Sequence, residues 1–452
     1  MFSMLRDKEF LKKFFKVSFP VMLHALILFI VNFADNIMVS SVSNEAVSAV
    51  YAANQATYIL MIASYGVIIG AGVFIQQFNG AKDTKNLKQA FCYKIVIMII
   101  FLIILITVYY LFGHYLINLY SYKDKNASVI YELGKDYLYL IIISYIPFCL
   151  SIVYTTTVRE IGATKYALIA GAAAFISNVI LNAIFIYGCD MGVVGAALGT
   201  IIARCIELFV IIMICHIKKF SFCHKLFKTF HIDCKLASSI TKKGLVFLAN
   251  ELFWVLGMTL LSLSYAQREN VLSSLSVVNS ISNIFNIIFQ GLSIGIGVMV
   301  GSYLGESNFK AAKDYAKKVY WLGFLASIIF GIIIICLSPF IPNMFKEVDP
   351  NQKIIASKML FAYGFLLFGS CLYCCCYVTL KTGGEALITF MIDSGLMWLV
   401  AVPLAWTLAK YTNISLLYLF IIITGIDIFK FLVSYLFVKR DKWLNNLALT
   451  AN

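Results

Sequence analysis

The segment "GVIIGAGVFIQQFNG" at residues 66–80 has a second copy, "GLSIGIGVMVGSYLG", at residues 291–305. The two copies align without a gap at an offset of 225 residues. Each copy presents glycines four residues apart, a pattern that lets membrane helices pack closely. Further along the chain, "VREIGATK" (158–165) matches "LKTGGEAL" (380–387) at an offset of 222. So small a drift in offset over that distance indicates a duplicated chain.

The composition is that of a membrane protein. Of the 452 residues, 61% are hydrophobic and 13% are charged, whereas soluble domains are about half apolar and a quarter charged. The sequence predicts an all-α fold in which twelve apolar segments are long enough to cross a hydrocarbon core of about 30 Å. These are residues 17–40, 49–76, 92–118, 136–158, 166–187, 193–217, 244–264, 272–301, 318–343, 354–380, 386–409 and 414–438.

The repeat predicts how the spans are arranged. Each copy contains six spans, so both copies enter the membrane in the same orientation, as two pseudo-symmetric six-helix bundles. In such parallel repeats, substrate and ion sites lie near the midplane between the bundles. Phe10, Phe14 and Phe15 among basic residues favour an interfacial helix at the N-terminus. The expected parts are an interfacial helix 1–16, an N-terminal lobe 17–217, a linker 218–243, a C-terminal lobe 244–438 and a tail 439–452.

The charge distribution predicts the topology. The net charge is +14, and 26 of the 36 Lys and Arg residues fall on one side of the predicted spans, against eight on the other. Because positive residues are retained on the cytoplasmic side, we expect both termini in the cytoplasm and the chain in the cell membrane. This bias explains the basic charge without a nucleic-acid partner. The cysteines of "CLYCCCY" (371–377) are interpreted as small packing residues rather than metal ligands.

Three acidic residues lie inside predicted spans with no Lys or Arg beside them in sequence to neutralise them: Asp35, Glu251 and Asp393. A carboxylate in a bilayer costs at least about 2.5 kcal/mol, so such residues point to function. A desolvated carboxyl group can exchange a proton for a cation, which is the elementary step of an antiporter. We therefore expect all three to couple transport to a cation or proton, with structural hydrogen bonding as the alternative.

Neutral oxygen donors accompany these acids. Asn178 and Asn182 lie on one face of the fifth span, and Thr200 in the sixth span could join them. One carboxylate with neutral oxygens suits Na⁺, so Asp35, Asn178 and Thr200 form a possible sodium site. Hydrogen bonds between packed helices are the alternative.

A polar stripe predicts a substrate cleft. Its residues step by four, three and four along the eighth span, which places them on one helix face. Asn32 lies one turn before Asp35 and Trp254 one turn after Glu251, so both are added to the cleft. The stripe residues are Asn279, Asn283, Asn286 and Gln290. Two charged pairs at i,i+3 are interpreted as structural: Arg204 with Glu207, and Asp427 with Lys430.

Over essentially its whole length the chain resembles the bacterial multidrug and toxic compound extrusion (MATE) transporters. The segments that carry the resemblance are "SFPVML", "FADNIMV", "GAGVFIQQFNGAKD", "VREIGATK", "SNVILNAIFIYG", "GVVGAALGT", "ANELFW" and "GLSIGIGVMVGSYLGE". The resemblance implies twelve helices in two lobes and export of small organic cations in exchange for Na⁺ or H⁺. It implies no enzymatic activity and no cofactor besides the coupling ion.

The resemblance also implies residue roles. Asp35 is similar to the family's acid in the first span, Asn178 and Thr200 to its partners, and Glu251 to the acid in the seventh span. The chain departs from some branches by having Asn182 in place of an Asp, and from others by lacking an acid near Ser370. Asp393 is a candidate substitute for that missing acid.

Two other functions remain open at this level. A flippase for lipid-linked precursors, from the same superfamily, would need basic residues in its cleft to hold a pyrophosphate. An integral membrane enzyme would need a nucleophile or a metal constellation. The sequence leaves open the substrate, the choice of Na⁺ or H⁺ and the oligomeric state, for which we expect a functional monomer surrounded by membrane lipid.

Overall fold

A computed structural model describes residues 7–40, 42–121, 127–224, 226, 230–265, 267, 272–345 and 349–450. Within these ranges the regular elements are all helical, and twelve of the helices are long and apolar enough to cross a membrane. The predicted all-α fold with twelve spans is confirmed. The chain divides into two compact units, called here the N-terminal unit (Phe19–Leu248) and the C-terminal unit (Ala249–Thr450 together with the chain up to Ser18).

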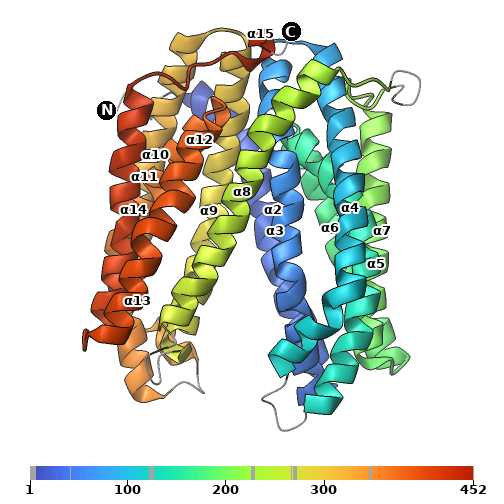
Figure 1. Ribbon diagram of the computed structural model, residues 1–452, viewed down its shortest axis with the longest axis vertical. Coiled ribbons are helices and arrows are strands. Elements are labelled where there is room, and N and C mark those ends of the chain that lie inside the picture. Colours follow the sequence, from blue (N-terminus) through green and yellow to red (C-terminus); the bar gives the residue numbers. More distant parts are fainter. Residues whose placement is uncertain are drawn as a thin grey trace. The chain divides into compact units, whose positions relative to one another are not determined.

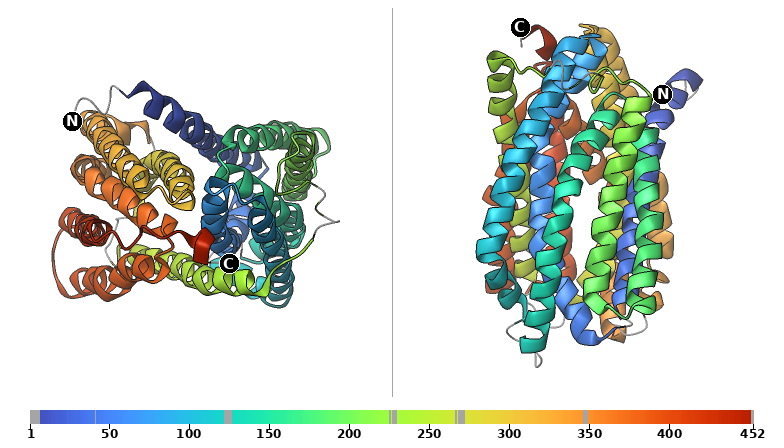
Figure 2. Two further views of the ribbon diagram at one scale, coloured as in Figure 1. Left: turned by 90° about the horizontal axis from the view of Figure 1, so that it is seen from above. Right: turned by 90° about the vertical axis from the view of Figure 1, so that its right-hand side faces the viewer.

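The N-terminal unit is built around one helix, α5, which packs against α3, α4, α6 and α7 (Figure 1). The right view of Figure 2 shows helices of this unit, coloured blue to green, lengthwise beside one another, and the left view shows them from above. Its elements are α2 (Lys8–Ser40), α3 (Asn44–Gly80), α4 (Thr84–Ser121), α5 (Ala127–Glu160), α6 (Thr164–Asn182), the π-helix η1 (Ala183–Gly188) and α7 (Gly192–Ile217).

The C-terminal unit repeats this plan around α11, which packs against α9, α10, α12 and α14. One span is assembled from four consecutive pieces, α12, η4, η5 and α13, of which η4 and η5 are π-helices. The elements are α8 (Cys234–Tyr265), α9 (Leu272–Gly305), α10 (Phe309–Leu337), η3 (Ile341–Met344), α11 (Pro350–Thr382), α12 (Ala386–Phe390), η4 (Met391–Gly395), η5 (Met397–Ala401), α13 (Val402–Tyr411), α14 (Leu416–Lys439) and α15 (Leu447–Thr450).

The first helix of each repeat begins in the other unit. Residues 8–18 of α2 belong to the C-terminal unit, and residues 234–248 of α8 belong to the N-terminal unit. Residues 8–16, which we expect to form an interfacial helix leading into the first span, continue into α2 without a break. Phe10 and Phe14 are 6% and 1% exposed and face a protein core, whereas Phe15 is 45% exposed.

The same backbone turns recur at both repeat offsets. Lys82 and Ser307, which are 225 residues apart, have φ angles of 56° and 58°. Gly162 and Gly384, 222 residues apart, both have φ of 80°, a conformation that glycine adopts without strain. The duplication seen in sequence thus extends to the conformation of the turns that end the helices.

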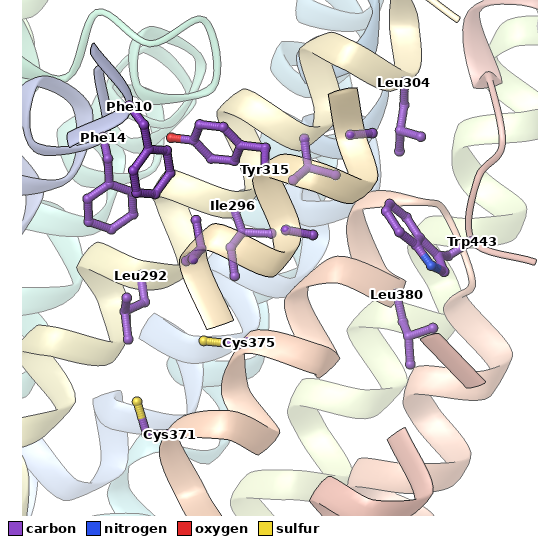
Figure 3. Close-up of a cluster of buried hydrophobic side chains, with 14 of the residues drawn as sticks. Phe10, Phe14, Leu292, Ile296, Leu304, Tyr315, Cys371, Cys375, Leu380 and Trp443 are labelled. Atoms are coloured by element: carbon purple, nitrogen blue, oxygen red, sulfur yellow. The ribbon is translucent and has the colours of Figure 1, made fainter. Parts of the chain in front are cut away.

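Figure 3 shows the apolar cluster that holds the start of α2 in the C-terminal unit. The ring of Phe10 meets that of Tyr315 edge-on at a centroid distance of 5.0 Å. Phe14 lies over Gly295, where a Cβ would collide with its ring. Cys371 and Cys375 are buried in the same cluster, and no group of three or more potential metal ligands occurs among the described residues.

A buried ion pair connects α4 to α5 in the N-terminal unit. Lys94 donates to both carboxylate oxygens of Glu160, at 2.8 and 2.6 Å, and its side chain is fully buried. Gly72 leaves the space for this carboxylate, because a Cβ there would collide with Oε1. The lysine lies inside α4 among hydroxyl and carboxylate acceptors.

Candidate functional site

The N-terminal unit brings the predicted sodium ligands together. Asn182 on α6 donates from Nδ2 to Asp35 Oδ1 on α2 at 2.7 Å. The same amide lies 3.4 Å from Asn178 Oδ1, and Asn178 Nδ2 lies 3.4 Å from Thr200 Oγ1 on α7. One chain of polar contacts therefore joins the four residues across three helices.

One acceptor oxygen in this chain of polar contacts receives no hydrogen bond from the described residues. Asn182 is 1% exposed, and its Oδ1 has no hydrogen-bond donor among the described residues. An unpaired buried carbonyl oxygen costs roughly 1–3 kcal/mol, so its retention calls for a reason. Gly199 on α7 makes the room, because a Cβ at this position would collide with that oxygen. The backbone changes to the π-helix η1 directly after Asn182, a distortion that is frequent at functional sites.

Arg204 and His24 of the N-terminal unit form their close polar contacts with residues other than Asp35. Arg204 pairs with Glu207 at 2.9 Å, which confirms the pair read from the sequence. Asp35 forms no ion pair among the described residues of the unit. His24 lies 3.0 Å from Arg159 through its Nδ1 atom and is buried against Gly171. Asp35 is therefore the predicted site acid of this unit, and it has no cationic partner within ion-pair distance among the described residues.

Asp393 in the C-terminal unit has the opposite surroundings. Its Oδ1 accepts from the Tyr373 hydroxyl at 2.8 Å and lies 3.2 Å from Lys430 Nζ. Its Oδ2 accepts from Asn250 Nδ2 at 3.0 Å. Ser394 donates to Asn250 Oδ1 at 2.7 Å, which fixes the amide with its NH₂ group toward the carboxylate. Asp393 sits inside the π-helix η4 and is 9% exposed.

The predicted pair between Asp427 and Lys430 is wrong. Lys430 forms its ion pair with Asp393, and Asp427 instead accepts from the Ser370 hydroxyl at 2.6 Å. The reason is tertiary packing, because α14 lies against both η4 and α11. The lysine therefore reaches an acid 37 residues away in sequence, while a hydroxyl on α11 satisfies its near neighbour.

Glu251 also has a basic partner that the sequence did not reveal. Lys381 Nζ lies 3.5 Å from Glu251 Oε1, with side chains 18% and 24% exposed, so the pair is looser and wetter than that at Asp393. Tyr377 lies between the two clusters. It is 3.1 Å from Asn250 Nδ2, and the Lys381 ammonium lies 5.4 Å from its ring centroid.

The predicted cleft residues divide into three groups. Trp254 is partly buried and packs against a core that contains Met397 and Ala401. The side chain of Asn32 lies outside the described residues. The stripe on α9 is exposed along its whole length, and two of its members contact each other at 3.4 Å. Its residues are Asn279, Asn283, Asn286 and Gln290.

Sequence reasoning missed the tyrosine and lysine partners of the C-terminal acids. Tyr373, Tyr377 and Lys381 all lie on α11, spaced by four residues on one helix face. That spacing was visible in the sequence and could have indicated a polar face toward α8. The bond between Lys430 and Asp393 had no such signal, because it joins residues on different helices.

Twelve apolar helices in two repeated units, each with a buried polar cluster that contains an acid, have the organisation of a secondary transporter built from parallel repeats. The MatE family model matches residues 20–184 and 246–407. The chain belongs to this family of membrane transporters and is not an enzyme.

Individual relatives are distant but extend over most of the chain. The "Probable multidrug resistance protein NorM" of Thermotoga maritima is 24% identical and covers 98% of this chain and 95% of its own. The "Multidrug export protein MepA" of Staphylococcus aureus is 26% identical over 67% of each chain. The solved structure described as "Crystal structure of MATE in the bent conformation" superposes with a TM-score of 0.87 at 18% identity, covering 99% of this chain and 98% of that one. This last likeness establishes the fold.

Proposed function

We propose that the protein exports small organic cations across the cell membrane by antiport, and that the coupling cation is Na⁺ bound at Asp35. Relatives whose names specify multidrug resistance or export support the substrate class. The repeated units support a mechanism of alternating access, in which the bundles rock about the bound ligand. Both termini face the cytoplasm, and a single chain is the working unit.

The observation that carries the choice of ion is the unpaired Oδ1 atom of Asn182 beside Asp35. The described residues supply one donor to the carboxylate, on Oδ1, and none to Oδ2. Asp35 and Asn182 can therefore each turn an oxygen lone pair toward a cation. Na⁺ can be bound by both oxygens together, whereas a proton on Asp35 would supply Asn182 Oδ1 with at most one hydrogen bond.

The organic cation is drawn to a different set of groups. Glu251 is more exposed than Asp393, the other predicted coupling acid of the C-terminal unit, and the polar stripe of α9 is exposed along its length. A partly exposed carboxylate attracts a cation at long range, and neutral amides accept many ligand shapes without demanding a fixed geometry. These groups suit a broad class of monovalent organic cations better than one specific substrate.

Reconstitution into liposomes tests the proposal. A fluorescent organic cation such as ethidium should accumulate in the vesicles when an outward Na⁺ gradient is imposed at equal pH inside and outside, with the membrane potential clamped. A K⁺ gradient of the same size serves as the matched control and should drive no uptake. Uptake that ignores Na⁺ and follows only a pH gradient would reject sodium coupling. No uptake under either gradient would reject cation export.

A further inference from the structure

The half-buried Asp35 and the buried Asp393 differ in what their neighbours offer. Every described contact to Asp393 is a donor: a tyrosine hydroxyl, an amide NH₂ group and an ammonium group. Both of its oxygens are thus engaged by hydrogens. Among the residues that the structure describes, Asp35 receives one donor, from Asn182, and the Oδ1 atom of the same asparagine receives none.

The lysine at Asp393 is held in a site built for it. Lys430 is 4% exposed, and its ammonium lies 3.2 Å from the carboxylate and 5.3 Å from the ring centroid of Tyr373. Burying an ammonium group costs several kcal/mol unless an opposite charge compensates it. Asp427 lies one turn earlier on the same helix and accepts from Ser370, whereas Asp393 is the carboxylate that lies within ion-pair distance of the ammonium among the described residues.

We propose that the Lys430 ammonium is a tethered cation that permanently occupies the cation position of Asp393. The C-terminal unit then binds no exchangeable alkali ion at this carboxylate, and each chain carries one Na⁺ site, at Asp35. The count of one site rests on the proposed function. The role of Lys430 does not, because it concerns only what Asp393 binds when the lysine is present or absent.

Removing the lysine should therefore create a sodium site. Lys430→Ala deletes the ammonium and leaves space beside a desolvated carboxylate, where Na⁺ and water can enter. The measurement is saturation binding of radioactive Na⁺ to the purified full-length protein at fixed pH and ionic strength. An Asp35→Asn background removes the N-terminal site, so that every bound ion reports on the C-terminal unit.

In that background we expect no bound Na⁺ with Lys430 present and one Na⁺ per chain after Lys430→Ala. Adding Asp393→Asn should abolish the new site. Lys318→Ala is the matched control. It also takes a lysine from carboxylates of the C-terminal unit, those of Asp7 and Asp314, but at a half-exposed position, and it should create no site.

Two results would overturn the inference. One is a folded Asp35→Asn/Lys430→Ala protein that binds no Na⁺, with folding judged by monodisperse elution and helical content. The other is an Asp393-dependent Na⁺ site that exists while Lys430 is present. If Lys430→Ala does not fold, the unaltered chain supplies the test, because two sites per chain would contradict a tethered cation. Absence of the Asp35 site alone would instead contradict the proposed function.

Discussion

At the scale of single residues, three acids of one chemical kind have three different environments. Asp393 is buried with a lysine and two further donors, Glu251 shares a wetter site with Lys381, and Asp35 has one amide donor among the described residues. The strength of an ion pair rises as solvent is excluded, so Asp393 is held most firmly and Glu251 less so. Asp35 is the acid of the three that has no cationic partner within ion-pair distance among the described residues. Neighbours on other helices, more than the acids themselves, set the role of each group.

For the pair formed by Glu251 and Lys381, we predict that changing the acid and changing the lysine have opposite effects on the affinity for a substrate cation. Glu251→Gln keeps the shape of the side chain but removes the charge that attracts a substrate cation. Binding of a monovalent organic cation should weaken about 5- to 150-fold, the usual range of a coupling energy. Lys381→Met frees the carboxylate and should tighten binding. Equilibrium titration of a fluorescent cation measures both variants, and equal affinities in the two would contradict a substrate role for Glu251.

The buried pair of Lys94 and Glu160 gives a prediction about stability. Lys94→Met leaves the Glu160 carboxylate buried without its cation, which should cost about 3–5 kcal/mol. The double change Lys94→Met/Glu160→Gln removes both charges and should recover most of the loss. Thermal unfolding of the detergent-solubilised protein compares the variants. A single variant as stable as the unaltered chain would mean that water reaches the carboxylate.

The sequence predicted the residues around Asp35 but not those around Asp393. Asn178 and Asn182 share a helix face by spacing alone, so their joint contact with Asp35 follows once α2 and α6 pack. Lys430 lies three residues after Asp427, and the rule that opposite charges at i,i+3 of a helix form a pair favoured the wrong partner. Distant partners such as Tyr373 depend on which helix lies opposite, and helical periodicity carries no information about that.

At the scale of elements, the repeat glycines hold the starts of the exchanged helices. Gly295 on α9 receives Phe14 and Ser18 of α2, and Gly70 on α3 receives Gly244 of α8 at the matching position of the other repeat. The small-residue pattern predicted close helix contacts. It did not reveal that each contact is made by the first helix of the opposite repeat, because the glycine pattern does not identify its partner.

A pair of glycine substitutions tests this role. Gly295→Ala forces a Cβ against the Phe14 ring and should destabilise the protein by about 1–3 kcal/mol, the usual cost of overpacking. Gly425→Ala on α14 is the matched control, because nothing lies within 4 Å of a Cβ there. This second change should be neutral or stabilising by up to about 1 kcal/mol, since alanine favours the helix. Thermal unfolding that ranks the two variants in the reverse order would contradict the contact.

At the scale of the whole molecule, one duplicated plan has diverged in chemistry. Each unit surrounds a central helix, α5 or α11, and similar left-handed turns end corresponding helices. At the 225-residue offset, however, Glu251 corresponds to Leu26 and not to Asp35. The two acids therefore occupy non-equivalent positions of the two repeats, although the helical scaffold is repeated.

The charge distribution gives a prediction about orientation. Because 26 of the 36 basic residues fall on one side, that side should be cytoplasmic. In a cysteine-free background, Met344→Cys after α10 should react with a membrane-impermeant maleimide added to intact cells. Glu306→Cys, between α9 and α10, should react only after the cells are permeabilised. Both positions are exposed, so the reverse pattern would invert the topology.

The central claim is that Na⁺ drives export through Asp35, and one comparison tests it most directly. Asp35→Asn and Glu251→Gln each remove one carboxylate, in the N-terminal and the C-terminal unit respectively. Both variants are reconstituted in equal amounts and assayed for Na⁺-driven uptake of an organic cation. We predict that Glu251→Gln needs more substrate but is still stimulated by Na⁺, and that Asp35→Asn shows no stimulation at any Na⁺ concentration. Sodium stimulation that persists in Asp35→Asn would contradict the account.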